Sequence, residues 1–311
     1  MVSVRDSFFN TIYELTKSGE DIYIITADLG APSLDEFRRD FPERYISIGI
    51  AEQSLVAVAA GLALGGKKVI AYGLNPFPVT RAFDQVRILM AEQKIPITLC
   101  ALNAGLCSAE CGYTHMPIED IAMLRTLSNV EIVNPTDETI SRKLAKEIVS
   151  SDIPRVIRFD KALNGCIYNE EDIDFRKGYV VSGSNKESKV GVVTSGCYAR
   201  EIRNWIAEND CESNVKLLDL FSLPVDEEAL VKELMACEHI VTIEENVLQG
   251  GIGSMILEIL SDKSCGKRVK RMGLDLRKGY YDVFTGREYI RKEQQIDIVR
   301  VGQEISRLLC E

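Results

Sequence analysis

A single glutamate, Glu52, stands in the first turn of an apolar stretch that favours a helix. Residues 51–65 read AEQSLVAVAAGLALG, with Leu55, Val58 and Leu62 on one face and small apolar residues on the others. A helix that is apolar all round is buried, either in a core or in a subunit interface. A carboxylate at its start either complements the helix dipole, by about 0.3–1 kcal/mol, or is a desolvated group that shares a proton with a ligand. The residues alone leave both interpretations open.

A second candidate for chemistry is His115, one of two histidines in the chain. It lies in a loop, residues 110–117, between a predicted strand and a predicted helix. Loops at the carboxyl ends of parallel strands are where α/β proteins bind ligands. The other histidine, His239, begins an apolar strand, where core packing explains it better. We therefore expect His115, rather than His239, to lie in a ligand site.

Cys107, Cys111 and His115 follow one another at four-residue spacing, which on a helix would place them on one face and could bind zinc. Gly105, Gly112 and Pro117 instead favour a loop. Structural zinc sites also need four ligands, and no fourth is evident nearby. We therefore expect no metal ligands on this chain.

The elements that must position these residues alternate between short apolar strands and amphipathic helices. The first group has strands at 22–27, 68–73, 96–102, 130–133 and 154–159, and helices at 3–18, 51–65, 79–93, 117–127 and 137–149. The second group has strands at 189–194, 215–219, 239–243 and 268–272, and helices at 197–209, 226–236, 251–261 and 295–309. Such alternation predicts α/β architecture with parallel sheets covered on both faces. We expect two doubly wound domains, 1–164 and the smaller 188–311, joined by a polar linker at 165–187.

Composition narrows the class of protein. The chain has 311 residues, a formal charge of −10 and 46% hydrophobic residues, as expected for a two-domain globular protein. The acidic balance argues against nucleic-acid binding, and no apolar run reaches the about 18 residues of a membrane span. No signal peptide is visible at the N-terminus. The nine cysteines form no Cys-x-x-Cys, so we expect reduced thiols in a cytoplasmic protein.

Several motifs, in order, resemble the transketolase and deoxyxylulose phosphate synthase family over nearly all 311 residues. Those of the first half are Asp28-Leu29, IGIAEQ at 48–53, AAGLA at 59–63, RAFDQVR at 81–87, GYTH at 112–115, IEDIA at 118–122 and NVEIVNPTD at 129–137. Those of the second half are LDLFSLPVD at 218–226, TIEEN at 242–246 and GGIGS at 250–254. The resemblance implies a pyrimidine-binding domain followed by a transketolase C-terminal-like domain.

The resemblance also implies a cofactor and a partner. In this family thiamine diphosphate binds between two polypeptide surfaces, and a Gly-Asp-Gly segment on the other surface holds the diphosphate through Mg²⁺. This chain contains no Gly-Asp-Gly and has about half the length of a full transketolase. It therefore resembles the C-terminal subunit of a split enzyme that transfers a two-carbon ketol unit from a ketose to an aldehyde. We expect an N-terminal partner subunit, an α2β2 assembly and sugar substrates.

By the same resemblance, Glu52 hydrogen-bonds a pyrimidine ring nitrogen and drives the cofactor's amino–imino tautomerism. His115 matches the histidine near the reacting carbon. Asp28 matches an acid near the thiazolium, and Ile50 belongs to the cofactor-binding motif. Arg158 matches an arginine that contacts a substrate phosphate.

The aromatic wall against the pyrimidine has two candidates, Tyr72 and Phe77, with Arg81 beside them. The spacing from Phe77 to Arg81 is one residue longer than the common family pattern. Two substrate positions also depart from the family. Cys111 replaces a usual aspartate, and a thiol cannot accept hydrogen bonds as a carboxylate does. Asn103 stands where transketolases can have a histidine, so we expect an unusual or nucleotide-linked sugar substrate.

Two other functions remain open. The β subunit of a 2-oxoacid dehydrogenase shares the two-domain layout and the glutamate, and a requirement for a lipoyl carrier would identify it. The other alternative is a non-catalytic assembly subunit. The joint presence of Glu52, His115 and Arg158 argues against it.

Overall fold

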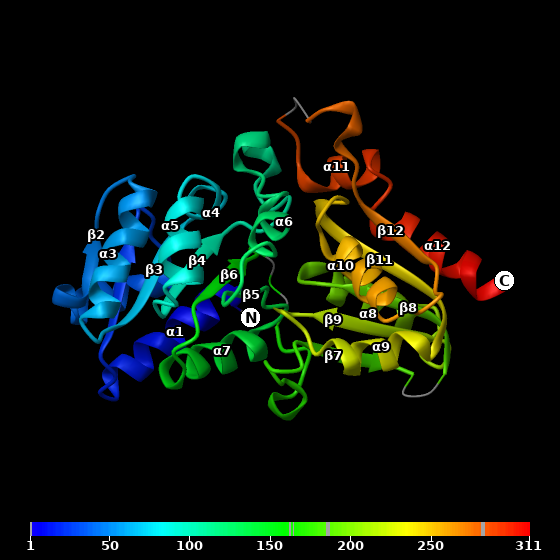
Figure 1. Ribbon diagram of the computed structural model, residues 1–311, viewed down its shortest axis with the longest axis horizontal. Helices are drawn as coiled ribbons and strands as arrows, with labels where there is room; N and C mark the ends of the chain where they lie inside the picture. The colour runs from blue at the N-terminus through cyan, green and yellow to red at the C-terminus, as the bar shows by residue number, and fades with distance from the viewer. Residues whose placement is uncertain (1, 162, 164, 185–186, 281–283) are drawn as a thin grey trace.

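The structure is a computed structural model that describes residues 2–161, 163, 165–184, 187–280 and 284–311. Two α/β domains lie side by side, each with helices around a central sheet (Figure 1). One sheet has seven strands and the other has five, with parallel pairing predominant in both. The prediction of two doubly wound α/β domains is confirmed.

The first sheet collects the apolar strands of the first half of the chain. Its strands are β1 (Ile22–Thr26), β2 (Tyr45–Ser47), β3 (Lys68–Leu74), β4 (Ile97–Leu102), β5 (Glu131–Val133), β6 (Arg155–Phe159) and β10 (Ser222–Leu223). The spatial order is β10-β5-β6-β4-β3-β1-β2, and all neighbours are parallel except β10 and β5. Every residue of β4 and β6 is buried, as expected for parallel strands covered on both faces.

The helices of the first domain cover both faces of this sheet. They are α1 (Val4–Lys17), α2 (Asp35–Asp40), α3 (Glu52–Leu64), α4 (Phe77–Thr80), α5 (Phe83–Gln85), a π-helix (Val86–Glu92), α6 (Asp120–Leu124) and α7 (Glu138–Ser150). Side chains cap two of them, because Ser3 accepts from the Asp6 N–H and Asp137 from the Ile140 N–H. The helix predicted at 79–93 is divided into several turns, and the one predicted at 117–127 shortens to α6.

The second sheet is built from strands of the second half of the chain. Its strands are β7 (Tyr179–Gly183), β8 (Ser188–Thr194), β9 (Val215–Leu220), β11 (Cys237–Val247) and β12 (Val269–Leu274), in the order β12-β11-β8-β9-β7. Its helices are α8 (Cys197–Glu208), α9 (Glu227–Met235), α10 (Ile252–Asp262), α11 (Arg287–Glu293) and α12 (Ile298–Cys310). We expected the segment 165–187 to be a linker. It contains β7, which is an edge strand of this sheet and pairs antiparallel with β9.

The two domains share backbone pairing as well as side-chain contacts. Strand β10 follows β9 in the chain but pairs with β5 of the first sheet, and Leu223 lies opposite Ile132. The Asn134 N–H also donates to the Phe221 carbonyl oxygen. Within the described residues, no helix combines the length and apolar character that crossing a bilayer requires.

Candidate active site

The predicted site residues of the first domain come from loops at one edge of the seven-stranded sheet. Asp28 follows β1, Ile50 follows β2, Phe77 follows β3 and Asn103 follows β4. These strands are parallel, so their carboxyl ends lie at the same edge, where ligands bind in open α/β sheets. Asp28 is exposed, with φ of 54°, and the Ile50 side chain is 74% exposed.

Glu52 is the first residue of α3 and is 4% exposed, so of the two interpretations the structure favours the desolvated carboxylate. The preceding Ala51 makes no side-chain cap to the helix. Instead, Arg81 donates from Nη1 to Oε2 of Glu52 over 2.7 Å. The Arg81 side chain is half-exposed, so this ion pair joins a buried acid to a partly solvated base.

Side-chain contacts lead from the Glu52–Arg81 ion pair through Phe77 to His115. The Arg81 guanidinium carbon lies 4.6 Å from the centroid of the Phe77 ring, a cation–π contact. The Phe77 ring meets the His115 ring nearly at right angles, with centroids 5.3 Å apart. Thr114 Oγ1 lies 2.9 Å from His115 Nδ1. The structure thus connects the two predicted catalytic residues by a continuous chain of contacts, Glu52–Arg81–Phe77–His115.

Tyr72 lies elsewhere, which corrects its assignment to the cofactor wall. Its side chain is 0% exposed and packs edge-on against Phe9, with centroids 5.0 Å apart. Burial raises the pKa of Tyr72 beyond the range of ordinary phenols. The ring is part of the hydrophobic core because β3 is covered on both faces of the sheet. Of the two aromatic candidates, only Phe77 contacts other predicted site residues.

Arg158 is likewise internal, which corrects its assignment to a substrate phosphate. It is 2% exposed and forms a bidentate pair with the fully buried Asp120, at 2.7 and 3.0 Å. Its Nη2 also donates to Asn246 of the second domain. Asn103 is buried too, with its Oδ1 3.9 Å from the Cys107 Sγ. Cys111, by contrast, is exposed in the loop that carries His115.

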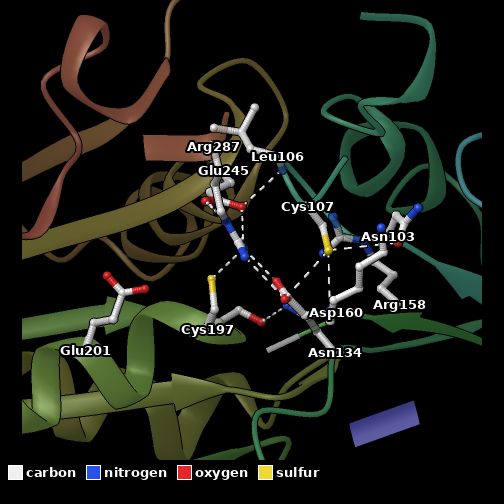
Figure 2. A network of polar contacts seen from close by, with 12 residues as sticks. Asn103, Leu106, Cys107, Asn134, Arg158, Asp160, Cys197, Glu201, Glu245 and Arg287 are labelled. Carbon is white, nitrogen blue, oxygen red and sulfur yellow. Dashed lines mark hydrogen bonds and ion pairs between the residues drawn. The ribbon is translucent and has the colours of Figure 1, made fainter. Parts of the chain in front are cut away.

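Sequence reasoning missed a buried polar network between the domains (Figure 2). Arg287 donates from Nη2 to Asp160 (2.6 Å), Glu245 (2.7 Å) and the Cys197 Sγ (2.8 Å). Asp160, Cys197 and Glu245 have ligand atoms within 4.8 Å of one another, a spacing suited to a metal ion. The guanidinium of Arg287 contacts all three, so this side chain supplies the positive charge between them.

Burial and neighbouring charges shift the pKa values of residues in and next to this network. Burial alone would raise the pKa of Glu245, but the Arg287 and Arg291 cations more than offset it and lower that pKa to about 2. Burial raises the pKa of the nearby Cys107 thiol to about 12. Glu245 is therefore an anion at neutral pH, and Cys107 is a neutral thiol. Only the motif TIEEN at 242–246 signalled this region in the sequence, without indicating its role.

Comparison with protein families matches both halves of the chain. Residues 1–165 match the family described as "Transketolase, pyrimidine binding domain", and residues 184–280 match "Transketolase, C-terminal domain". One subunit of the apulose-4-phosphate transketolase of Phocaeicola vulgatus is 31% identical over 277 residues, which cover 86% of this chain and 87% of that protein. The 1-deoxy-D-xylulose-5-phosphate synthase 1 of Geobacter sulfurreducens is 32% identical, over 86% of this chain but 42% of that protein.

A solved structure titled "Split gene transketolase, inactive beta4 tetramer" has the same fold. It superposes with a TM-score of 0.84 at 26% identity, covering 100% of this chain and 99% of that one. A transketolase from Campylobacter jejuni superposes with a TM-score of 0.76 at 19% identity, over 98% of this chain and 46% of that one. The matches in both halves, in sequence and in fold, identify this chain as a member of the transketolase family.

Proposed function

We propose that this chain is the C-terminal subunit of a split, thiamine-diphosphate-dependent transketolase-like transferase. The reaction is transfer of a two-carbon ketol unit from a ketose to an aldehyde acceptor. The observation that carries the proposal is the chain of contacts Glu52–Arg81–Phe77–His115 at the carboxyl edge of the sheet. It joins a buried acid, an aromatic ring and a histidine in a member of the transketolase family.

The residues present fit the pyrimidine half of thiamine diphosphate. A pyrimidine ring needs an acid for its ring nitrogen and an apolar surface for its face. Glu52 supplies the acid: Oε2 accepts from Arg81, which leaves Oε1 to share a proton with the ring nitrogen. Phe77 and the exposed Ile50 supply apolar surface. When bound, the cofactor supplies the carbon nucleophile and the electron sink for ketol transfer.

The protein residues then have separate roles. Arg81 holds the Glu52 carboxylate in place at the start of α3. Where the Thr114 hydroxyl donates to His115 Nδ1, the other ring nitrogen, Nε2, carries the hydrogen and can donate to a substrate oxygen. Asp28 lies at the same edge, where it would face the thiazolium. Burial of Glu52 excludes water from the acid that would contact the cofactor.

A second polypeptide follows from the same proposal. The 311 residues contain no Gly-Asp-Gly, so the diphosphate and its Mg²⁺ would be held mainly by a separate N-terminal partner subunit. Two relatives covered over 87% and 90% of their length are each named as one subunit of a transketolase, which supports a division of the enzyme into two chains. We propose an α2β2 assembly in which each site lies between the two kinds of chain.

The proposed substrate-binding region differs from the usual family pattern, because an exposed cysteine, Cys111, stands in the His115 loop where an aspartate is usual. A thiol there favours a less polar or differently substituted sugar than a carboxylate would. The names of two relatives contain apulose 4-phosphate, which supports a sugar other than the ordinary pentose phosphates. A donor and acceptor screen should include apulose 4-phosphate, pentose phosphates and nucleotide-linked sugars. Best activity with ordinary pentose phosphates would contradict this part of the proposal.

The decisive experiment is Glu52→Gln in the chain reconstituted with the Gly-Asp-Gly polypeptide of a neighbouring reading frame. Turnover should fall by about 100-fold or more, because an acid–base group is removed. Light scattering should show unchanged assembly. The matched control is Glu227→Gln, since Glu227 is also the first residue of a helix but is exposed on α9. Equal activity of the Glu52→Gln and parent enzymes would refute the proposal.

A further inference from the structure

The loop of residues 106–118 carries both Cys111 and His115 but has little regular structure of its own. It contains two short 3-10 helices, Ala109–Cys111 and Tyr113–His115. Gly112 joins them with φ of 79° and ψ of 178°, a conformation essentially reserved for glycine. A loop without a helix or strand ladder depends on other segments for its position.

Three consecutive residues of β11 in the second domain hold both ends of this loop. At the first end, the Leu106 N–H donates to Oε2 of Glu245 over 3.1 Å. At the other end, the Val247 N–H and the Asn246 Nδ2 both donate to the Ile118 carbonyl oxygen, over 2.9 and 3.0 Å. One short piece of strand therefore fixes the distance between the two loop ends.

Glu245 is itself held rigidly (Figure 2). Arg287 donates to both of its carboxylate oxygens, at 2.6 and 2.7 Å, and Arg291 donates to Oε1 at 2.6 Å. Arg287 also pairs with Asp160, which follows β6 of the first domain. At Gly105 an added Cβ would lie 2.7 Å from Oε2 of Glu245, so the backbone approaches this carboxylate closely. A buried, doubly paired carboxylate is a precise anchor for the loop.

The second domain also covers the middle of the loop. A Cβ added at Gly112 would lie 2.9 Å from the Phe284 ring, so the edge of this ring touches the loop backbone while most of the side chain is exposed. Tyr280 has its ring centroid 6.1 Å from that of Tyr113, and its hydroxyl donates to Glu119 over 2.6 Å. The loop is thus held at both ends and contacted on its surface by one domain.

We propose that Glu245 is a positioning residue, and that β11 together with Phe284 sets where Cys111 and His115 lie relative to Glu52. The inference rests on the proposed function, because it assigns to the second domain the positioning of the residues that would contact the substrate in that site. Cofactor activation at Glu52, on α3, is then separable from substrate positioning at the loop. The two can be measured independently.

The first test needs neither cofactor nor partner. Hydrogen–deuterium exchange of the isolated chain should be followed by mass spectrometry for peptides spanning 106–118 and α3. Glu245→Ala should speed exchange in 106–118 by about tenfold, because a charge-assisted hydrogen bond to the backbone is lost. Glu245→Gln, which keeps an acceptor, should show a smaller increase. Peptides of α3 should not change.

The matched control is Glu233→Ala, which removes the acid paired with the buried Lys216 in the same domain, away from the loop. It should leave exchange in 106–118 unchanged. If Glu245→Ala does not fold, Phe284→Ala replaces it as the deciding variant, since that side chain is 79% exposed and its loss should not unfold the chain. The proposal is overturned if Glu245→Ala leaves hydrogen exchange in 106–118 unchanged. If Glu245→Ala does not fold, the same result with Phe284→Ala overturns it.

The second test uses the reconstituted enzyme and thiamine diphosphate. Glu245→Gln and Phe284→Ala should raise KM for the ketose about fivefold, with the exchange rate of the cofactor C2 proton, read by NMR, within about twofold of the parent. Glu52→Gln should instead slow that proton exchange. A slowed C2 exchange in Glu245→Gln with unchanged KM overturns the positioning role. A normal C2 exchange in Glu52→Gln overturns the proposed function and leaves the deuterium result standing.

Discussion

Arg81 donates a hydrogen bond from Nη1 to Oε2 of Glu52, so the buried acid at the start of α3 has a half-exposed cation as its partner. The two residues lie 29 positions apart in the chain: Glu52 begins α3, and Arg81 directly follows α4. This pairing keeps a charged group inside the protein without a second buried charge. It also places the acid next to the aromatic ring of Phe77.

Replacing Arg81 by Met should lower the free energy of unfolding by about 1 kcal/mol, because Glu52 stays buried but loses its partner, and Arg81 is half-exposed. Arg81→Lys keeps the charge and should lose less. Urea denaturation of the isolated chain measures both, and calorimetry of the assembled enzyme measures cofactor affinity. A fully stable Arg81→Met chain that binds cofactor normally would show that the pair has no role.

Ile50 offers a test of the cofactor surface. Its side chain is 74% exposed, so Ile50→Ser should change the stability of the isolated chain by less than about 0.5 kcal/mol. In the assembled enzyme the same change should weaken thiamine diphosphate binding several-fold. Leu64→Ser is the control, because Leu64 is 73% exposed at the other end of α3. Equal cofactor affinity in the two variants would contradict a role for Ile50.

Gly112 and Phe284 should be energetically coupled. Gly112→Ala introduces a Cβ at positive φ and 2.9 Å from the Phe284 ring, so it should cost about 1–3 kcal/mol. In a double-mutant cycle, Phe284→Ala should recover part of this loss by removing the steric conflict. Thermal unfolding of the four chains provides the measurement. Strict additivity would mean that the ring moves aside freely.

We expect the stability of the chain to depend on pH because of the buried carboxyl group of Asp219. Burial raises its pKa to about 7 from the ordinary 3.8, and hydrogen bonds from Thr136 and Tyr168 lower it only in part. The folded chain therefore keeps a proton that the unfolded chain releases, and stability falls as pH rises from about 4 to 7. Asp219→Asn has no such proton, so its advantage over the parent should grow across this range, by up to about 4 kcal/mol. Parallel stability curves for the two chains would contradict this assignment.

The sequence predicted the parts of this molecule that depend on local pattern. Apolar strands of four to seven residues and amphipathic helices between them indicate parallel sheets, and the burial of Glu52 follows from the apolar helix that it begins. The same reasoning could have excluded Tyr72 and Arg158, because both lie inside strands that are covered on two faces. Their family roles obscured that simpler argument.

The rest depends on contacts between residues far apart in the chain. Glu245 lies 139 positions from Leu106, and nothing near either residue indicates that they meet. Phe284 stands in a short segment without helical or strand periodicity, so its contact with Gly112 could not be predicted. Strands β2, β7 and β10 were also missed, because their pairing partners determine that they are strands.

Strand β10 makes the second half of the chain an edge cap for the first. Ser222 and Leu223 occupy the open side of β5, which would otherwise present unpaired N–H and C=O groups to solvent. Such a bare edge is a template for aggregation. A fragment that ends near residue 165 would expose it, although that boundary agrees with the match to the pyrimidine-binding family. The two domains should therefore be expressed and refolded together. Cutting the chain between them removes a strand from the first sheet and does not merely sever a flexible linker.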